Sequence, residues 1–215
     1  MRVLLNQRLS SKFAKPLAFA LALLPFVWLL TAAALDWLGA NPAEALERST
    51  GDWTLRMLCV VLAITPLRTM AGLPALARFR RMAGLFVYFY AVLHLLAYSW
   101  FDMGFDVEDI AKDIVKRPFI LVGFTAIVLL TPLALTSFNR AIRALGGRQW
   151  QLLHRLVYVI AVLAIVHFFW MRAGKHNFAE VAVYAAILGS LLGWRVAKAI
   201  KKKASQPSSM LRSQL

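Results

Sequence analysis

Six long runs of apolar residues, separated by short polar stretches, dominate the pattern of the chain. A helix needs about 20 mostly apolar residues to cross the hydrocarbon core of a bilayer, which is roughly 30 Å thick. The pattern therefore predicts an all-α membrane protein with six transmembrane helices and short loops. The predicted spans cover residues 16–35, 53–68, 82–101, 118–137, 150–171 and 178–197.

The remaining polar residues predict only short segments outside the bundle. We expect a cytoplasmic N-terminus at 1–15, a transmembrane domain at 16–197, and a basic, disordered cytoplasmic tail at 198–215. Composition supports this organisation, because 60% of the 215 residues are hydrophobic and only 16% are charged. A soluble domain has about 45–50% apolar and about 25% charged residues. A separate soluble catalytic domain is not expected.

The chain has 25 Lys and Arg residues but only 10 Asp and Glu residues, and the segments between the predicted spans alternate between basic and acidic. Basic residues precede the first span, follow the second, fourth and sixth spans, and are sparse in the other loops, where acidic residues gather. Lys and Arg are retained on the cytoplasmic side during insertion. Both termini are therefore predicted to be cytoplasmic. The net charge of +15 indicates topology and contact with anionic membrane lipid, and this placement argues against nucleic-acid binding.

Three histidines fall inside the predicted spans, where ionisable side chains are costly and suggest function. At 1.5 Å per residue, His94 lies about 18 Å and His167 about 25 Å from the inner end of its span. Both are predicted in the outer half, on two helices that run in the same direction. His154 is predicted about 6 Å in, near the cytoplasmic face.

Neutral imidazoles that face each other in a dry helix bundle suit axial ligation of haem iron. A zinc site usually needs three or four protein ligands, and no cysteine or acidic residue lies at the depth of His94 and His167. The competing interpretation is that each histidine makes an interhelical hydrogen bond. His154 and His167 are about 20 Å apart along one helix, so they would serve two different sites and need a bent helix.

Arg80 and Arg81 are predicted at the depth where a partner of His154 would lie. Arginine is a poor iron ligand because it stays protonated, but it suits a haem propionate or a flavin phosphate. An equally good interpretation is that both residues anchor a helix end at the cytoplasmic surface. The sequence has no glycine-rich dinucleotide fingerprint, so electrons would come from a separate donor or from quinol.

Several stretches taken together resemble the MsrQ (formerly YedZ) family of haem-binding membrane subunits. They include RRMAGLFVYFYAVLHLLAYSW, KRPFILVGFTAIVLLTPLALTSFNRAIRALG and WQLLHRLVYVIAVLAIVHFFW, and the resemblance covers about residues 20–200. The broader relatives are ferric reductases and NADPH oxidases, with a six-helix core and histidines on the third and fifth spans. The resemblance implies a ferric reductase-like bundle in the bacterial inner membrane.

The resemblance also implies one or two b-type haems and FMN, with His94, His154 and His167 as the matching family histidines. Electrons would pass from the quinone pool, or from a cytosolic flavin reductase, to MsrP, a periplasmic molybdenum enzyme that reduces methionine sulfoxide in proteins. One histidine stands on the third span where NADPH oxidases have two, so the ligand set of an inner haem is open.

Two other classes of function remain open. A six-span transporter or channel would use the histidines to line a polar path, and a structural anchor would only recruit a periplasmic enzyme. The acidic loop DMGFDVEDIAKD is expected either to steer a basic patch of a partner or simply to follow the topology.

Overall fold

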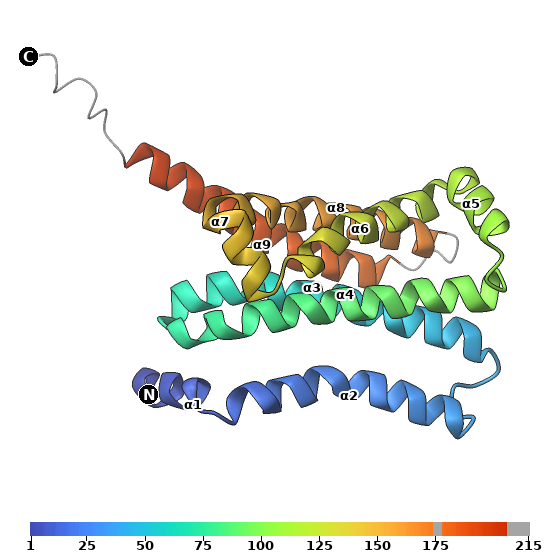
Figure 1. Ribbon diagram of the computed structural model, residues 1–215, viewed down its shortest axis with the longest axis horizontal. Helices are drawn as coiled ribbons and strands as arrows, with labels where there is room; N and C mark the ends of the chain where they lie inside the picture. The colour runs from blue at the N-terminus through green and yellow to red at the C-terminus, as the bar shows by residue number, and fades with distance from the viewer. Residues whose placement is uncertain (174–177, 206–215) are drawn as a thin grey trace, which may run out of the picture.

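A computed structural model describes residues 1–173 and 178–205 (Figure 1). Within these ranges the regular structure is helical. The α-helices are α1 (Arg2–Ser10), α2 (Ala14–Ala34), α3 (Pro42–Ala71), α4 (Arg80–Ala97), α5 (Val107–Lys116), α6 (Pro118–Leu135), α7 (Asn139–Leu153), α8 (Leu156–Ala173) and α9 (Ala179–Ala204). The 3-10 helix η1 (Pro74–Phe79) leads into α4, and the π-helical turn η2 (Tyr98–Asp102) follows it.

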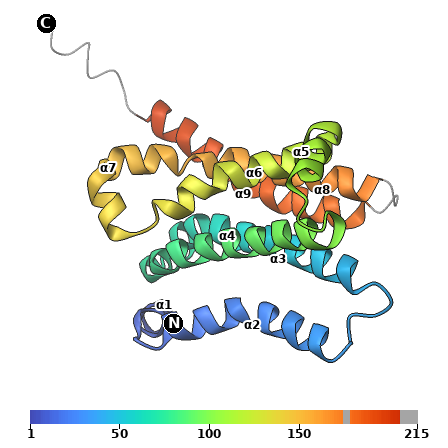
Figure 2. The ribbon, with the colours of Figure 1, turned by 45° about the vertical axis from the view of Figure 1, so that its right-hand side comes forward.

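Among the described residues, six helical segments are long and apolar enough to cross a membrane: α2, α3, the continuous segment Pro74–Asp102, α6, α8 and α9. This finding confirms a multi-pass membrane protein. Successive spans run in opposite directions, so α1 and the C-terminal end of α9 lie at one end of the bundle and α5 at the other (Figures 1 and 2). These are called the α1 end and the α5 end below.

The first residue predicted for the fifth span was wrong. It was expected to begin at residue 150, but α7 ends at Leu153 and α8 begins at Leu156. His154 therefore lies in a turn between two helices. The Trp150 indole donates a hydrogen bond to the Thr136 carbonyl oxygen at 3.0 Å, which ties α7 back to the end of α6 before the chain enters α8.

Two other boundaries also differ from the sequence prediction. The helix α3 begins at Pro42, well before residue 53, because Asn41 caps it by accepting a hydrogen bond from the Glu44 backbone N–H at 3.2 Å. The helix α9 continues to Ala204, so residues 198–204 are helical and the predicted disordered tail does not begin at 198. Alanine and lysine favour helix there. Residues 206–215 of that predicted tail lie outside the described residues.

The bundle is built around α3 and α4, which pack along their lengths, with α6 against α8 and α9 against both α3 and α8. Tyr90 lies at the centre of the core and is fully buried. Its hydroxyl donates to the Ala22 carbonyl oxygen on α2 at 2.7 Å. The helix α2 otherwise lies at the periphery of the bundle (Figure 2), which leaves α3, α4, α6 and α8 to enclose the site.

Candidate cofactor site

His94 on α4 and His167 on α8 meet inside the bundle. Their ring centroids are 6.2 Å apart, and the ring planes are inclined by 73°. The two helices run in the same direction (Figure 1), as the spacing of the spans predicted. The fold thus brings together two imidazoles that lie at matched depth in different spans.

Each of these rings is oriented by a backbone carbonyl of a third or fourth helix. His94 Nδ1 lies 2.9 Å from the Glu47 carbonyl oxygen on α3, and His167 Nδ1 lies 2.7 Å from the Phe119 carbonyl oxygen on α6. A carbonyl oxygen only accepts hydrogen bonds, so Nδ1 carries the proton in both rings. The lone pair is therefore on Nε2, which is the arrangement that metal-binding histidines use.

Two glycines make room for the rings. A Cβ atom at Gly123 on α6 would stand 2.8 Å from both Cε1 and Nδ1 of His167, and one at Gly51 on α3 would stand 3.2 Å from Cε1 of His94. Contacts below 3.0 Å are essentially forbidden for a real Cβ. Each imidazole therefore lies close against a neighbouring helix. A side chain at Gly123 would clash with the His167 ring, whereas one at Gly51 would require the His94 ring to shift by a few tenths of an ångström.

A cavity of about 390 Å³ is enclosed by α3, α4, α6 and α8, and both imidazoles line it. Its walls are mostly apolar, and its size falls within the usual range of about 300–1,000 Å³ for cofactor pockets. The described residues contain no group of three or more His, Cys, Asp or Glu side chains that could hold a metal ion. Two imidazoles in an apolar cavity fit a haem, whose porphyrin supplies the remaining iron ligands.

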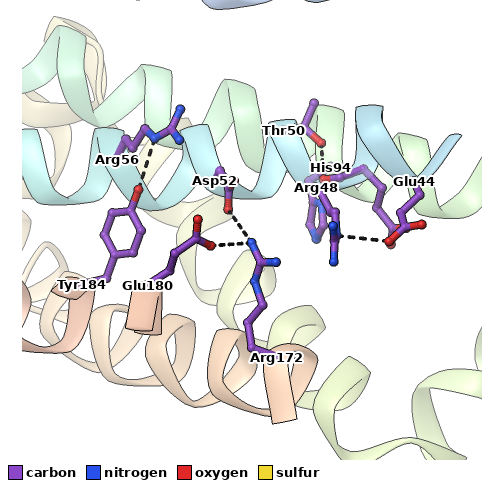
Figure 3. A network of polar contacts seen from close by, with 10 residues as sticks. Glu44, Arg48, Thr50, Asp52, Arg56, His94, Arg172, Glu180 and Tyr184 are labelled. Carbon is purple, nitrogen blue, oxygen red and sulfur yellow. Dashed lines mark hydrogen bonds and ion pairs between the residues drawn. The ribbon is translucent and has the colours of Figure 1, made fainter. Parts of the chain in front are cut away.

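The cavity is not fully closed, and charged residues line its α5 end, which is called the mouth below: Glu44, Glu47, Arg48, Asp52, Asp102, Arg117 and Arg172. Figure 3 shows part of this network. Arg172 Nη2 lies 2.7 Å from Glu180 Oε2 and 3.9 Å from Asp52 Oδ1, and Arg48 pairs with Glu44 at 3.2 Å.

Sequence reasoning did not single out these arginines or the two glycines. Near the end of a hydrophobic run, an arginine is indistinguishable from one that snorkels to the membrane interface. A glycine within an apolar helix gives an equally weak signal. Only the packing of α3, α6 and α8 around the histidines distinguishes Gly51, Gly123 and Arg172 from other residues of the same type.

His154 lies apart from this pair and does not line the cavity. Its Nδ1 donates to the Trp150 carbonyl oxygen at 2.9 Å, and the Trp150 indole stacks on the ring at 3.8 Å. Its Nε2 is 3.5 Å from Ser137 Oγ. Burial is the main cause that lowers the pKa of the His154 imidazole from 6.5, and the charge of Arg80 lowers it further. A neutral ring suits ligation.

The arginines that the sequence singled out, Arg80 and Arg81, lie at the start of α4, at the α1 end. Arg80 is close enough to act electrostatically on the His154 ring, and Arg81 donates from Nη1 to Asn139 Oδ1 at 2.7 Å. Neither lines the cavity of His94 and His167. Among the described residues, no second histidine ring stacks on or faces His154.

The chain is similar to a family of membrane proteins and to several named proteins of one kind. Residues 50–165 match the family described as "Ferric reductase like transmembrane component". Three similar proteins are each named "Protein-methionine-sulfoxide reductase heme-binding subunit MsrQ". The one from Polaromonas naphthalenivorans (strain CJ2) is 73% identical over 183 residues, covering 85% of this chain and 84% of that protein.

The relative from Herminiimonas arsenicoxydans is 54% identical over 190 residues, covering 88% of this chain and 87% of that protein. The relative from Ralstonia nicotianae (strain ATCC BAA-1114 / GMI1000) is 56% identical over 176 residues, covering 82% of this chain and 81% of that protein. No solved structure matches the chain.

Proposed function

Because this chain belongs to the MsrQ family of ferric reductase-like membrane proteins, we propose that it is the haem-binding, electron-transferring subunit of a protein-methionine-sulfoxide reductase. The observation that carries the proposal is the paired arrangement of His94 and His167, with ring centroids 6.2 Å apart. Each ring is held by a carbonyl on Nδ1, which leaves Nε2 for iron. The names of the relatives support the same cofactor.

In this proposal His94 and His167 would hold the iron of a b-type haem. A haem bound there supplies one-electron redox chemistry inside the membrane. The carbonyls of Glu47 and Phe119 keep both rings in the ligating orientation. The walls contributed by α3, α4, α6 and α8 are mostly apolar, which suits a porphyrin ring.

A second cofactor position is proposed at the α1 end, around His154, Arg80 and Arg81. There His154 is the ligand of a second b-type haem, or the arginines bind the phosphate of FMN. The electrostatic effect of Arg80 on the His154 ring supports a shared site. Asn139 holds the Arg81 guanidinium in a defined position, as a site for an anionic cofactor group requires.

The direction of transfer follows from the proposed topology in the bacterial inner membrane. Basic residues concentrate at the α1 end, which we place in the cytoplasm with both termini. Electrons then enter there from the quinone pool or a cytosolic flavin reductase. They leave at the α5 end to an MsrP-like periplasmic molybdenum enzyme, on which sulfoxide is reduced. The acidic segment 102–113 faces that partner and steers its approach.

The test is a visible spectrum of the detergent-purified protein, oxidised and then reduced with dithionite, with extracted haem counted per chain. A low-spin b-type spectrum is expected. One haem per chain would assign only the His94 and His167 site, and two would include His154. A folded but colourless protein after haem-supplemented expression would overturn the proposal and leave a transporter or channel as the better interpretation.

A further inference from the structure

The helix α5 places a buried carboxylate beside the mouth of the cavity. Asp113 is 9% exposed and is the one acidic residue buried in the described part of the chain. A buried carboxylate is costly unless it is paired and hydrogen-bonded. Asp113 has two partners: the Tyr98 hydroxyl donates to Oδ2 at 2.8 Å, and Arg117 Nε donates to Oδ1 at 2.8 Å.

These two partners come from the segments that carry the histidine site. Tyr98 opens the π-helical turn η2, four residues after His94. Arg117 caps α6, two residues before Phe119, whose carbonyl orients His167. Asp113 thus links the end of α4 to the residue that precedes α6, and both of its partners line the cavity. A π-helical turn is itself a frequent mark of a functional site.

Arg117 differs from Arg172 in which guanidinium nitrogen it uses, and from Arg48 in how its partner is held. Arg48 also pairs through Nε, but at 3.2 Å with Glu44, whose side chain is 39% exposed, whereas Asp113 is buried. Arg172 directs its terminal Nη2 to carboxylates. Arg117 uses Nε for Asp113, and its side chain lines the cavity while remaining 55% exposed. The planar guanidinium has further N–H groups on its two terminal nitrogens. Because Asp113 is bound to Nε of Arg117, the N–H groups on the two terminal nitrogens remain for a ligand.

We propose that Arg117 binds a carboxylate of the haem in this cavity, and that Asp113 is the residue that positions it. This inference rests on the proposed function, because a propionate is the carboxylate that a haem would bring to the mouth. Glu47, Asp52 and Asp102 also line the mouth and would repel such a group. A fixed arginine offsets this repulsion, since a charge-assisted hydrogen bond is strong and directional.

The first test compares Arg117→Gln with Lys116→Gln in the purified haem protein. Both changes remove one positive charge, but Lys116 is exposed and is absent from the cavity lining. Arg117→Gln should speed haem transfer to apomyoglobin on the order of ten- to one-hundredfold. It should also lower the midpoint potential, because a nearby positive charge favours the reduced haem. Lys116→Gln should leave both unchanged.

The second test separates positioning from simple charge. Asp113→Asn removes a negative charge, so a purely electrostatic role predicts tighter haem retention. Positioning predicts the opposite, because the Arg117 fork loses its fixed partner and haem transfer becomes faster. Tyr98→Phe removes only the other hydrogen bond of Asp113, and it should affect haem transfer less than Asp113→Asn does.

Unchanged haem transfer and potential in Arg117→Gln would overturn the assignment of Arg117. Unchanged or slower transfer in Asp113→Asn would overturn the positioning role. If Arg117→Gln does not fold, Arg117→Lys retains the charge without the fork, and wild-type transfer in that variant would also count against the proposal. Failure of the proposed function is distinguishable, because the wild-type protein itself would then carry no haem.

Discussion

The pair His94 and His167 differs from His154 in where the partners of each ring come from. The hydrogen-bond acceptors of the pair lie 47 and 48 residues away, on other helices. The acceptor of His154 is Trp150, only four residues back in the preceding helix. The same residue type is therefore oriented by tertiary packing in one place and by a local turn in the other.

The groups that surround the rings also differ between the two regions. His94 and His167 face each other across a cavity walled by four helices, with a glycine behind each ring. His154 has an indole stacked on one side and arginine charge nearby. The first region offers two ligating nitrogens and the second offers one. We therefore expect the pair to bind haem without help, whereas a cofactor at His154 needs a further ligand or an anionic group.

The largest effect should come from removing one member of the pair. His94→Ala or His167→Ala leaves a single axial nitrogen, so either variant should lose one haem per chain and its low-spin spectrum. Haem extraction and reduced-minus-oxidised spectra measure this. Full haem content and an unchanged spectrum in both variants would contradict the assignment.

A smaller but still large effect should follow from filling the space behind a ring. In Gly123→Ala the new Cβ would meet His167 at 2.8 Å and push the ring away from the Phe119 carbonyl. Overpacking costs about 1–3 kcal/mol, so haem affinity should fall about ten- to one-hundredfold. Gly51→Ala, with 3.2 Å to His94, should weaken binding less.

Gly189→Ala is the matched control for both glycine variants, because a Cβ there has nothing within 4 Å. Titration of haem into haem-depleted protein gives the three affinities. Equal affinities for Gly123→Ala and Gly189→Ala would show that close contact with the His167 ring is unnecessary.

His154→Ala should leave the haem site at His94 and His167 intact, and it therefore tests whether the two regions are separate sites. The spectrum of the haem at His94 and His167 should persist, because none of the residues that orient those rings contacts His154. Any second haem should be lost, which haem counting detects. Loss of the entire spectrum in a folded variant would show that the two regions form one site.

The smallest effect is expected for Ser137→Ala. Its hydroxyl lies 3.5 Å from His154 Nε2, at the limit of a hydrogen bond, and also donates to the Leu133 carbonyl oxygen at 2.7 Å. We expect a change in unfolding free energy of about 0.5 kcal/mol or less and an unaltered spectrum. Thermal unfolding and the reduced spectrum measure these, and a clear spectral change would mean that Ser137 helps to orient His154.

Much of the site could be predicted from periodicity and depth. His94 and His167 were expected at similar depth in two parallel spans, and the structure places their rings together. The fifth span was predicted to begin too early, because Trp150, Leu152 and Leu153 extend the apolar run but belong to α7. Hydropathy alone cannot detect a turn at His154, since the turn depends on where Trp150 bonds to α6.

The sequence by itself determined the number of membrane-spanning helices and the depth of the two paired histidines. Both follow from properties read along the chain, because bilayer thickness sets how many apolar residues one span needs. Only the tertiary structure decided which carbonyl orients each imidazole, which glycines accommodate the rings, and that the Tyr98 hydroxyl at the end of α4 meets Asp113 on α5. The reason is physical, since these contacts join residues on different helices, and their geometry exists only after the helices pack.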